Sequence, residues 1–228
     1  MTATVIIPAA GSGTRMGGGS NKLFLSLGGK PVLEWSLEVF QAHPGISEIL
    51  LVVREQDIPV IQSDYNLLNK FSKVNHIIAG GETRQDSVRI GLEHFAGAPP
   101  EYVLVHDGAR PFCSEALISR IITALGSGIA VVPMLPIHDT VRKVTEELTQ
   151  VLDRSNLYRS QTPQGFHFMP LLTAHRDAKK SGVMSTDDGQ IMEWKGHHVV
   201  GVAGDEQNIK LTTPMDMKFL ESWLASLD

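Results

Sequence analysis

Short apolar runs alternate along the chain with segments whose apolar residues recur every three or four positions. The runs predict buried strands, and these lie at residues 5–7, 49–53, 77–79, 102–105, 129–134 and 198–202. The segments between them predict helices at residues 31–43, 58–68, 83–92, 114–125, 169–180, 186–194 and from 213 onward. Strands and helices in this alternation predict an α/β fold, Rossmann-like, with a mostly parallel sheet and helices on both faces.

The alternation stops at Pro136, where two short strands (140–144 and 150–154) flank a polar turn without a helix to cover them. An isolated hairpin is marginally stable in water, so its apolar side needs a partner. We therefore expect a single domain over residues 1–228, in which residues 136–158 form a protruding β-arm subdomain. We expect the arm to bind a second copy of the chain and form a homodimer; the alternative is that it folds back on its own domain.

A glycine-rich loop follows the first strand, beginning after Pro8, which has no N–H to donate and is expected to end the strand pairing. Glycines let backbone N–H groups approach an anion closely, and Arg15 and Lys22 add two positive charges. The loop is not a Walker A motif, because Leu23 follows Lys22, and Met16 breaks the dinucleotide fingerprint. We expect it to hold a triphosphate; the alternative is a plain strand-to-helix turn.

Two further polar segments follow predicted strands directly. Residues 80–87 form a Gly-rich turn that could contact a base or ribose, or could simply be a capped helix start. Asp107 and Arg110 follow the strand at 102–105, where a carboxylate can orient a polyol or a metal ion and an arginine can bind phosphate; the alternative is a structural ion pair. Because ligands bind beyond the carboxyl ends of parallel strands, these segments and the glycine loop are expected to share one cleft.

Isolated polar residues in the last third of the chain carry weaker signals. Lys210 stands between two apolar residues, which suggests a lysine directed inward at an anion, although most lysines are simply solvated. Thr162 and Thr186 supply hydroxyls that could contact a substrate. Arg154, at the end of the hairpin, is either an exposed cation or a residue that reaches a neighbour's cleft.

The overall composition limits the classes of partner. A formal charge of -5 and a pI near 6.0 argue against a nucleic-acid surface, so an anionic substrate must meet a local cluster of cations. Cys113 is the single cysteine, which excludes an intramolecular disulfide and suits a reducing cytosol. No apolar run is long enough to span a membrane, and no secretion signal is evident. We expect a cytoplasmic protein that binds neither nucleic acid nor membrane.

As a set, the motifs resemble those of the 2-C-methyl-D-erythritol 4-phosphate cytidylyltransferases over essentially the whole chain. They are PAAGSGTR at 8–15, NK at 21–22, GGETRQDSV at 80–88, HDGARP at 106–111, DR at 153–154, TPQ at 162–164, TDD at 186–188 and NIK at 208–210. The resemblance implies transfer of a cytidylyl group from CTP to 2-C-methyl-D-erythritol 4-phosphate. The other product is pyrophosphate, and the reaction belongs to the non-mevalonate route to isoprenoid precursors.

The resemblance also implies roles position by position. The catalytic cations would be Arg15, Lys22 and Lys210. The nucleotide would be bound by Ala9, Ala10, Gly11, Gly13, Gly81, Glu82, Ser87 and Asp107. The acceptor would be bound by Asp107, Arg110, Thr140, Arg154, Thr162, Thr186 and Lys210, with Thr140 and Arg154 supplied across the dimer. The family commonly has Asp where Glu82 stands. Mg²⁺ is the expected cofactor, held mainly by the triphosphate, with Asp107 as a candidate ligand.

The implied chemistry agrees with these residues. The attacking group is a phosphate monoester, mostly dianionic at neutral pH, so it needs no general base. The difficulty is to bring one anion onto another, which cations and Mg²⁺ would relieve by stabilising the charge that develops in the transition state. Two alternatives stay open: a cytidylyltransferase that acts on ribitol 5-phosphate, and a catalytically silent regulatory module that binds CTP without releasing pyrophosphate.

Overall fold

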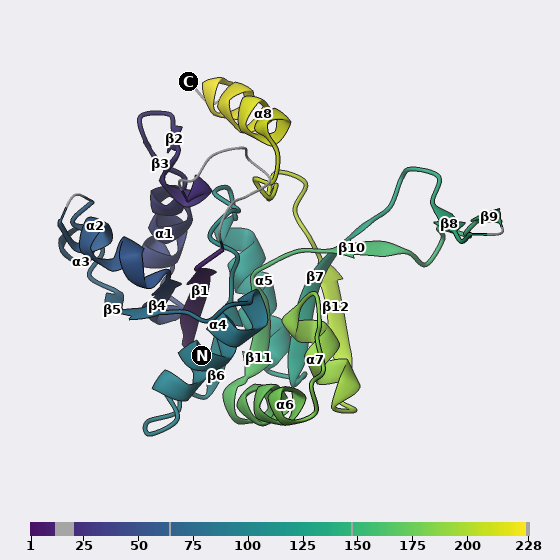
Figure 1. The fold of residues 1–228 in the computed structure, drawn as a ribbon, viewed down its shortest axis with the longest axis horizontal. Helices are drawn as coiled ribbons and strands as arrows, with labels where there is room; N and C mark the ends of the chain where they lie inside the picture. The colour runs from purple at the N-terminus through teal and green to yellow at the C-terminus, as the bar shows by residue number, and fades with distance from the viewer. Residues whose placement is uncertain (12–20, 64, 147, 227–228) are drawn as a thin grey trace.

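A twisted sheet with helices on both faces forms the body of the molecule (Figure 1). The computed structural model describes residues 1–11, 21–63, 65–146 and 148–226. The sheet runs β10-β7-β11-β6-β1-β4-β5, and β12 pairs with β7. Its strands are β1 (Ala3–Ala9), β4 (Ile46–Val53), β5 (Val74–Ala79), β6 (Tyr102–Val105), β7 (Ala130–Pro136), β10 (Tyr158–Ser160), β11 (Gln164–His167) and β12 (Val199–Ala203).

The helices lie close to their predicted ranges. They are α1 (Val32–Ala42), α2 (Ile58–Ser63), α3 (Leu67–Lys70), α4 (Arg84–His94), α5 (Glu115–Leu125), α6 (Phe168–Lys180), α7 (Asp188–Trp194) and α8 (Pro214–Ala225). The single helix expected at 58–68 is instead two short ones, because Asn66 adopts a left-handed conformation with φ 48°. Within the described ranges, no helix combines the length and apolar character that a membrane crossing would need.

Alternate residues of β1 face two separate cores. Val5 and Ile7 pack in one apolar cluster with α1 and α5, whereas Ile6 packs in the other with α4, α6 and α7. The same alternation explains Pro8. The His106 N–H donates to the Ile6 carbonyl, so the backbone N–H and C=O groups of the even-numbered β1 residues point toward β6. The N–H that Pro8 lacks would point to the same side. Pairing with β6 therefore ends at Ile6, but pairing with β4 continues to Ala9, so the expectation that Pro8 ends the ladder is wrong on one side.

The centre of the sheet differs from a purely parallel arrangement. The strand β11 lies antiparallel between β6 and β7, and the sequence pattern did not predict a strand there. A Cβ on Gly165 would lie 2.5 Å from Ile121 Cγ2, so the glycine lets α5 pack directly on this strand. The prediction of a mostly parallel sheet is confirmed, with β10 and β11 as its antiparallel members.

The predicted hairpin is present as β8 (Arg142–Val144) and β9 (Thr149–Val151), and Figure 1 shows it projecting from the body on the extensions of β7 and β10. It does not fold back on its own domain. The exposed fractions of Val144, Leu148 and Val151 are 70%, 53% and 50%. These apolar side chains leave the arm open to a partner, and the homodimer stays a prediction. A second small hairpin, β2 (Ser26–Leu27) and β3 (Lys30–Pro31), precedes α1.

Candidate active site

A cavity of about 280 Å³ opens beyond the carboxyl ends of β1, β5 and β6. The glycine-loop residue Gly11, the turn residue Gly81 and Asp107 all line it, which confirms that the three segments share one cleft. Of the other residues predicted for the nucleotide, Ala9, Ala10, Glu82 and Ser87 also line it, and so do two of the predicted catalytic cations, Lys22 and Lys210. Gly13 and Arg15 lie outside the described residues.

The turn at residues 80–81 brings backbone to one wall of this cavity. A Cβ on Gly80 would lie 2.7 Å from Ser87 Oγ and 2.8 Å from Ala10 Cβ, so a larger residue would push these groups apart. Thr83 caps the N-terminus of α4, and Ser87 Oγ accepts a hydrogen bond from the Gly81 N–H at 3.2 Å. The predicted capped helix is thus confirmed, and it also places its first turn at the cavity.

Lys22 is held by a buried network that begins with the preceding residue. Asn21 Nδ2 donates to the Ala9 carbonyl at 3.0 Å and to Asp57 Oδ2 at 3.1 Å. Arg54 donates to both oxygens of Asp57, at 2.7 and 2.8 Å. Lys22 Nζ donates to the Leu211 carbonyl at 2.6 Å, beside Lys210. These hydrogen bonds link the end of β1 to the segment after β4, and Lys22 itself to the C-terminal segment.

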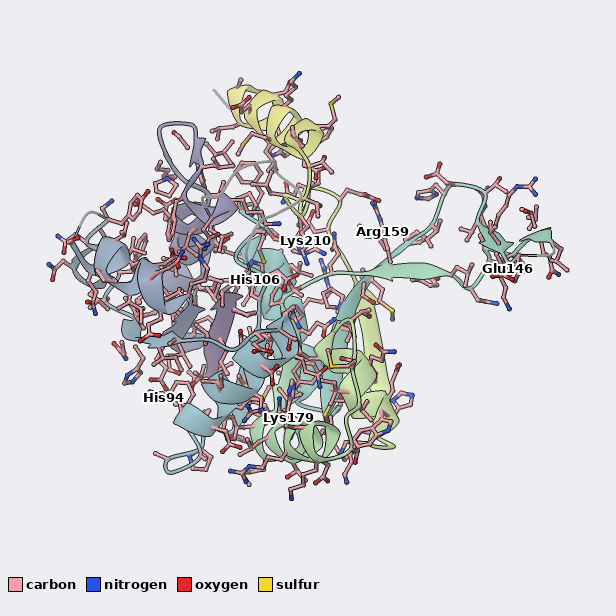
Figure 2. The ribbon with its side chains drawn as sticks, in the orientation of Figure 1. His94, His106, Glu146, Arg159, Lys179 and Lys210 are labelled. Carbon is pink, nitrogen blue, oxygen red and sulfur yellow. The ribbon has the colours of Figure 1, made fainter. Side chains whose placement is uncertain are left out.

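A second cavity, of about 320 Å³, adjoins the first. Arg110, Thr162 and Thr186, which the sequence assigned to the acceptor, all line it. Among the residues that the structure describes, three line both cavities: Arg84, Asp107 and Lys210. We call these three residues the shared wall. Figure 2 labels Lys210 at the upper edge of the sheet, on the side from which the arm leaves the body.

Asp107 is the centre of the shared wall. Its Oδ1 accepts from Arg84 Nε at 2.8 Å, and its Oδ2 accepts from Lys210 Nζ at 2.5 Å. Burial opposes ionisation of Asp107, but the charges of Arg84 and Lys210 outweigh burial and hold the pKa of this carboxyl well below its usual range. Asp107 is therefore an ionised anchor that fixes the directions of two cations.

Hydrogen bonds of His106 and Thr162 fix the loop that carries Asp107. Thr162 Oγ1 accepts from the Asp107 N–H at 3.0 Å and lies 3.4 Å from His106 Nδ1, while His106 Nε2 lies 3.2 Å from the Arg110 carbonyl. Burial lowers the pKa of His106 to about 4, so the ring is neutral at pH 7. These bonds assign the proton to Nε2, which leaves Nδ1 to accept from the Thr162 hydroxyl.

The C-terminal segment is hydrogen-bonded to the same loop. The Leu211 N–H donates to the Ala109 carbonyl at 2.8 Å, and Arg110 Nη1 donates to the Asn208 carbonyl at 2.7 Å. Burial lowers the pKa of Arg110, against the raising effect of Asp107. A lysine 103 residues from Asp107 in the chain is thereby fixed at the cleft.

The sequence motifs assign no role to two charged residues at the site, Arg84 and Asp188. Arg84 stands in the GGETR turn and Asp188 in the TDD cap, and each position had an adequate explanation as part of a helix start. Arg84 also binds Asp188, with Nη1 donating to Oδ2 at 2.8 Å. An arginine at the first position of a helix whose N-terminus faces an anion-binding turn was the available signal.

Thr140 and Arg154 are not brought to the site within one chain. Both are exposed residues of the arm, and neither lines either cavity. The described residues contain no group of three or more His, Cys, Asp or Glu side chains that could hold a metal ion, and the expectation that Asp107 is one ligand of a metal held mainly by the triphosphate stays a prediction. Both of its oxygens already accept bonds from cations.

An α/β sheet with a glycine-lined cavity at its carboxyl edge, and a second cavity beside it that Arg84, Arg110 and Lys210 line, is the arrangement expected of a nucleotidyltransferase. A sequence profile of the 2-C-methyl-D-erythritol 4-phosphate cytidylyltransferases matches residues 3–226, and this chain belongs to that family. It is therefore an enzyme that transfers a cytidylyl group to 2-C-methyl-D-erythritol 4-phosphate, as the motifs predicted.

Individual relatives agree over the full length. The 2-C-methyl-D-erythritol 4-phosphate cytidylyltransferase of Syntrophotalea carbinolica is 40% identical over 225 residues, which cover 98% of this chain and 97% of the relative. That of Bacillus cereus is 42% identical over 224 residues, covering 97% of each. The crystal structure of the Thermus thermophilus enzyme superimposes with a TM-score of 0.82 at 34% identity, covering 99% of this chain and 100% of that one. The 4-diphosphocytidyl-2C-methyl-D-erythritol synthase of Anaerococcus prevotii gives a TM-score of 0.85 at 33% identity, covering 98% of each chain.

Proposed function

We propose that this chain joins CTP to 2-C-methyl-D-erythritol 4-phosphate by direct attack of the acceptor phosphate on the α-phosphorus of CTP. One observation carries this proposal: two adjoining cavities share the wall formed by Arg84, Asp107 and Lys210. A nucleotide in the first cavity and a polyol phosphate in the second would meet at that wall. The product would serve isoprenoid precursor synthesis.

The reaction balances without a proton acceptor. An oxygen of the acceptor phosphate forms a bond to the α-phosphorus, the bond from this phosphorus to the bridging α–β oxygen breaks, and pyrophosphate leaves with the electron pair. Lys210 at the shared wall and Lys22 at the nucleotide cavity would stabilise the charge that builds on the α-phosphate and the leaving group. Arg15 would act with them. The neutral His106 is fully buried and takes no part as a base.

The nucleotide and the acceptor would be recognised by different means. The small residues Ala9, Ala10, Gly11 and Gly81 present backbone groups to the nucleotide, and Gly13 would extend this lining. Glu82 and Ser87 stand at the helix start beside it. In the second cavity Arg110 would bind the acceptor phosphate, while Thr186 offers a hydroxyl to the polyol. Thr162 accepts a hydrogen bond from the Asp107 N–H and lines the second cavity.

We propose Mg²⁺ as the cofactor, entering as the metal complex of CTP. Among the described residues, Asp107 is the one carboxylate that lines both cavities, and its two oxygens already accept from Arg84 and Lys210. The phosphate oxygens would therefore be the main ligands, and Asp107 would be at most an additional one. When bound, Mg²⁺ neutralises charge on the triphosphate. The residues of the chain then supply the remaining positive charge.

The arm would complete the acceptor site across a homodimer. The second cavity contains Arg110 but neither Thr140 nor Arg154, which lie on the exposed arm. The exposed apolar residues Val144, Leu148 and Val151 give the arm a surface that a second copy could cover. We propose that each arm delivers Thr140 and Arg154 to its neighbour. We place this dimer in the cytoplasm, where the buried Cys113 stays reduced.

Pyrophosphate release tests the function directly. The purified chain is assayed with each of the four ribonucleoside triphosphates against 2-C-methyl-D-erythritol 4-phosphate and ribitol 5-phosphate, in the presence of Mg²⁺. We expect release with CTP and the methylerythritol acceptor. Preference for ribitol 5-phosphate would replace the acceptor assignment, and CTP binding without release from either acceptor would support a regulatory module. Chelation by EDTA is expected to abolish release, and addition of Mg²⁺ to restore it.

A further inference from the structure

A row of five polar side chains runs from the shared wall into the interior. Lys210 binds Asp107 at 2.5 Å, Asp107 binds Arg84 at 2.8 Å, and Arg84 binds Asp188 at 2.8 Å. Asp188 Oδ1 in turn accepts from His175 Nε2 at 3.0 Å. The first three residues line the cavities, whereas Asp188 and His175 line neither. The row thus continues past the site into groups that no step of the reaction uses.

The inner pair is fully buried. Asp188 and His175 are both 0% exposed. Burial opposes ionisation of Asp188, but the charge of Arg84 together with the hydrogen bonds from His175 and Arg84 outweighs burial, and the pKa of this carboxyl lies below its usual value. A buried carboxylate is costly unless its oxygens are satisfied, and here one oxygen accepts from Arg84 and the other from His175. Both oxygens of Asp188 are therefore occupied, one by Arg84 and the other by His175.

The geometry at Arg84 shows what this pair can control. A guanidinium is planar, and its Nε and Nη1 atoms lie on different parts of the fork. Nε donates to Asp107 and Nη1 donates to Asp188, so two carboxylates fix the plane from two directions. With Asp107 alone, Arg84 would be free to turn about that single bond. Asp107 would then lose a fixed partner, and the direction of Lys210 would be set less firmly.

We propose that Asp188 and His175 are positioning residues, which hold Arg84 and thereby set Asp107 and Lys210 in the shared wall. The inference rests on the proposed reaction and extends it to side chains behind the site. A displacement of about 1 Å from a reacting group can cost about 100-fold in rate. The role is therefore expected to appear in kcat more than in nucleotide affinity.

A purely structural role is the competing explanation, because the same contacts join α4, α6 and α7. The chain offers a matched control for it. Arg176, next to His175 on α6, binds Glu93 on α4 through two hydrogen bonds of 2.7 and 2.6 Å. Glu93→Gln therefore weakens contact between α4 and α6 without touching the row of five. It is expected to lower the melting temperature slightly and to leave kcat unchanged.

The test compares Asp188→Asn with Glu93→Gln in the full chain. The expected result for Asp188→Asn is a fall in kcat of about 10- to 100-fold. The dissociation constant of Mg–CTP, measured by calorimetry, should stay within about twofold or become tighter, because a negative charge is removed behind the wall. Arg84→Lys keeps the charge but not the fork, and combining it with Asp188→Asn should add little further loss, since both act through the same contact.

Two results would overturn the inference. One is a folded Asp188→Asn variant with wild-type kcat, and the other is losses from Arg84→Lys and Asp188→Asn that simply multiply. Should Asp188→Asn fail to fold, the kcat values of His175→Gln and His175→Leu test the inference instead. The glutamine amide can still donate to Asp188, so His175→Gln should keep a higher kcat than His175→Leu, and equal kcat values would overturn the inference. Failure of the proposed reaction would show instead in the wild type, as absence of pyrophosphate release.

Discussion

Lys210 Nζ lies 2.5 Å from Asp107 Oδ2, although the two residues are 103 positions apart in the chain. The contact depends on the hydrogen bonds that join the C-terminal segment to the loop after β6. It places an ammonium group where both cavities open. The electrostatics of the proposed reaction therefore depend on a segment outside the sheet as much as on the glycine loop.

Removal of either lysine at the site should reduce turnover far more than stability. Lys22→Ala and Lys210→Ala are each expected to lower kcat by about 10²–10³, by analogy with loss of one preorganised contact to a developing oxyanion. We expect the same of Arg15→Ala. Steady-state pyrophosphate release and thermal melting measure the two effects. Lys195→Ala, which removes a surface cation paired with Asp177, serves as the control. Wild-type kcat in Lys22→Ala and Lys210→Ala would refute the assignment.

Exchange of arms between subunits should be visible by complementation. Lys22→Ala damages the body of a site, whereas Arg154→Ala damages the arm, so a mixed dimer of the two variants would contain one intact site. An equal mixture, dissociated and reassembled, is expected to recover about a quarter of the wild-type rate, because half of the dimers are mixed and each holds one good site. If the arm served its own subunit, the mixture would recover nothing beyond the average of the two variants.

The network behind Lys22 should act through that lysine. Asp57→Asn disrupts the bonds from Arg54 and Asn21 and is expected to cost about 3 kcal/mol of stability, since it breaks a largely buried ion pair. It should also lower kcat about tenfold by loosening Lys22. In a Lys22→Ala background the same change should lower stability but not kcat any further. Equal kcat losses in both backgrounds would show that the network acts elsewhere.

A methyl group at the nucleotide turn should close the first cavity. Gly80→Ala would place its Cβ within 2.8 Å of Ser87 Oγ and Ala10 Cβ, and relief of this contact moves the cavity wall. We expect a stability cost of about 1–3 kcal/mol and at least a tenfold weaker affinity for CTP, measured by calorimetry. Gly97→Ala is the matched control, because nothing lies within 4 Å of its added methyl group. Equal CTP affinity in both variants would contradict the placement of the nucleotide.

Stability should fall as pH drops below about 6.5, partly because of His106. Its pKa in the folded state is about 4, whereas an unfolded histidine titrates near 6.5, so between these values only the unfolded chain takes up the proton. This favours unfolding, by about 2 kcal/mol at pH 5 relative to pH 7.5. Urea unfolding at both pH values measures the loss. His106→Gln should reduce the pH dependence, whatever its effect on overall stability, and an unchanged dependence would contradict the neutral buried ring.

Local patterns in the sequence determined the elements and the family. Buried runs such as Val5–Ile7, caps such as Thr83, and the glycine loop are set by contacts within a few residues, and the strand ends alone predicted that Gly11, Gly81 and Asp107 would meet. The hairpin was predicted for the same reason, since alternation and a polar turn are local signals.

Only the tertiary structure decided which charges face one another. The insertion of β11 between β6 and β7 and the break at Asn66 have no local signature strong enough to predict them. In the sequence Arg84 is an ordinary first residue of a helix, whereas in the fold its guanidinium binds Asp107 and Asp188, which are 23 and 104 positions away. Pairing of buried charges is set by distances across the fold, and the spacing of residues along the chain does not show which of the side chains gathered at one cleft will pair.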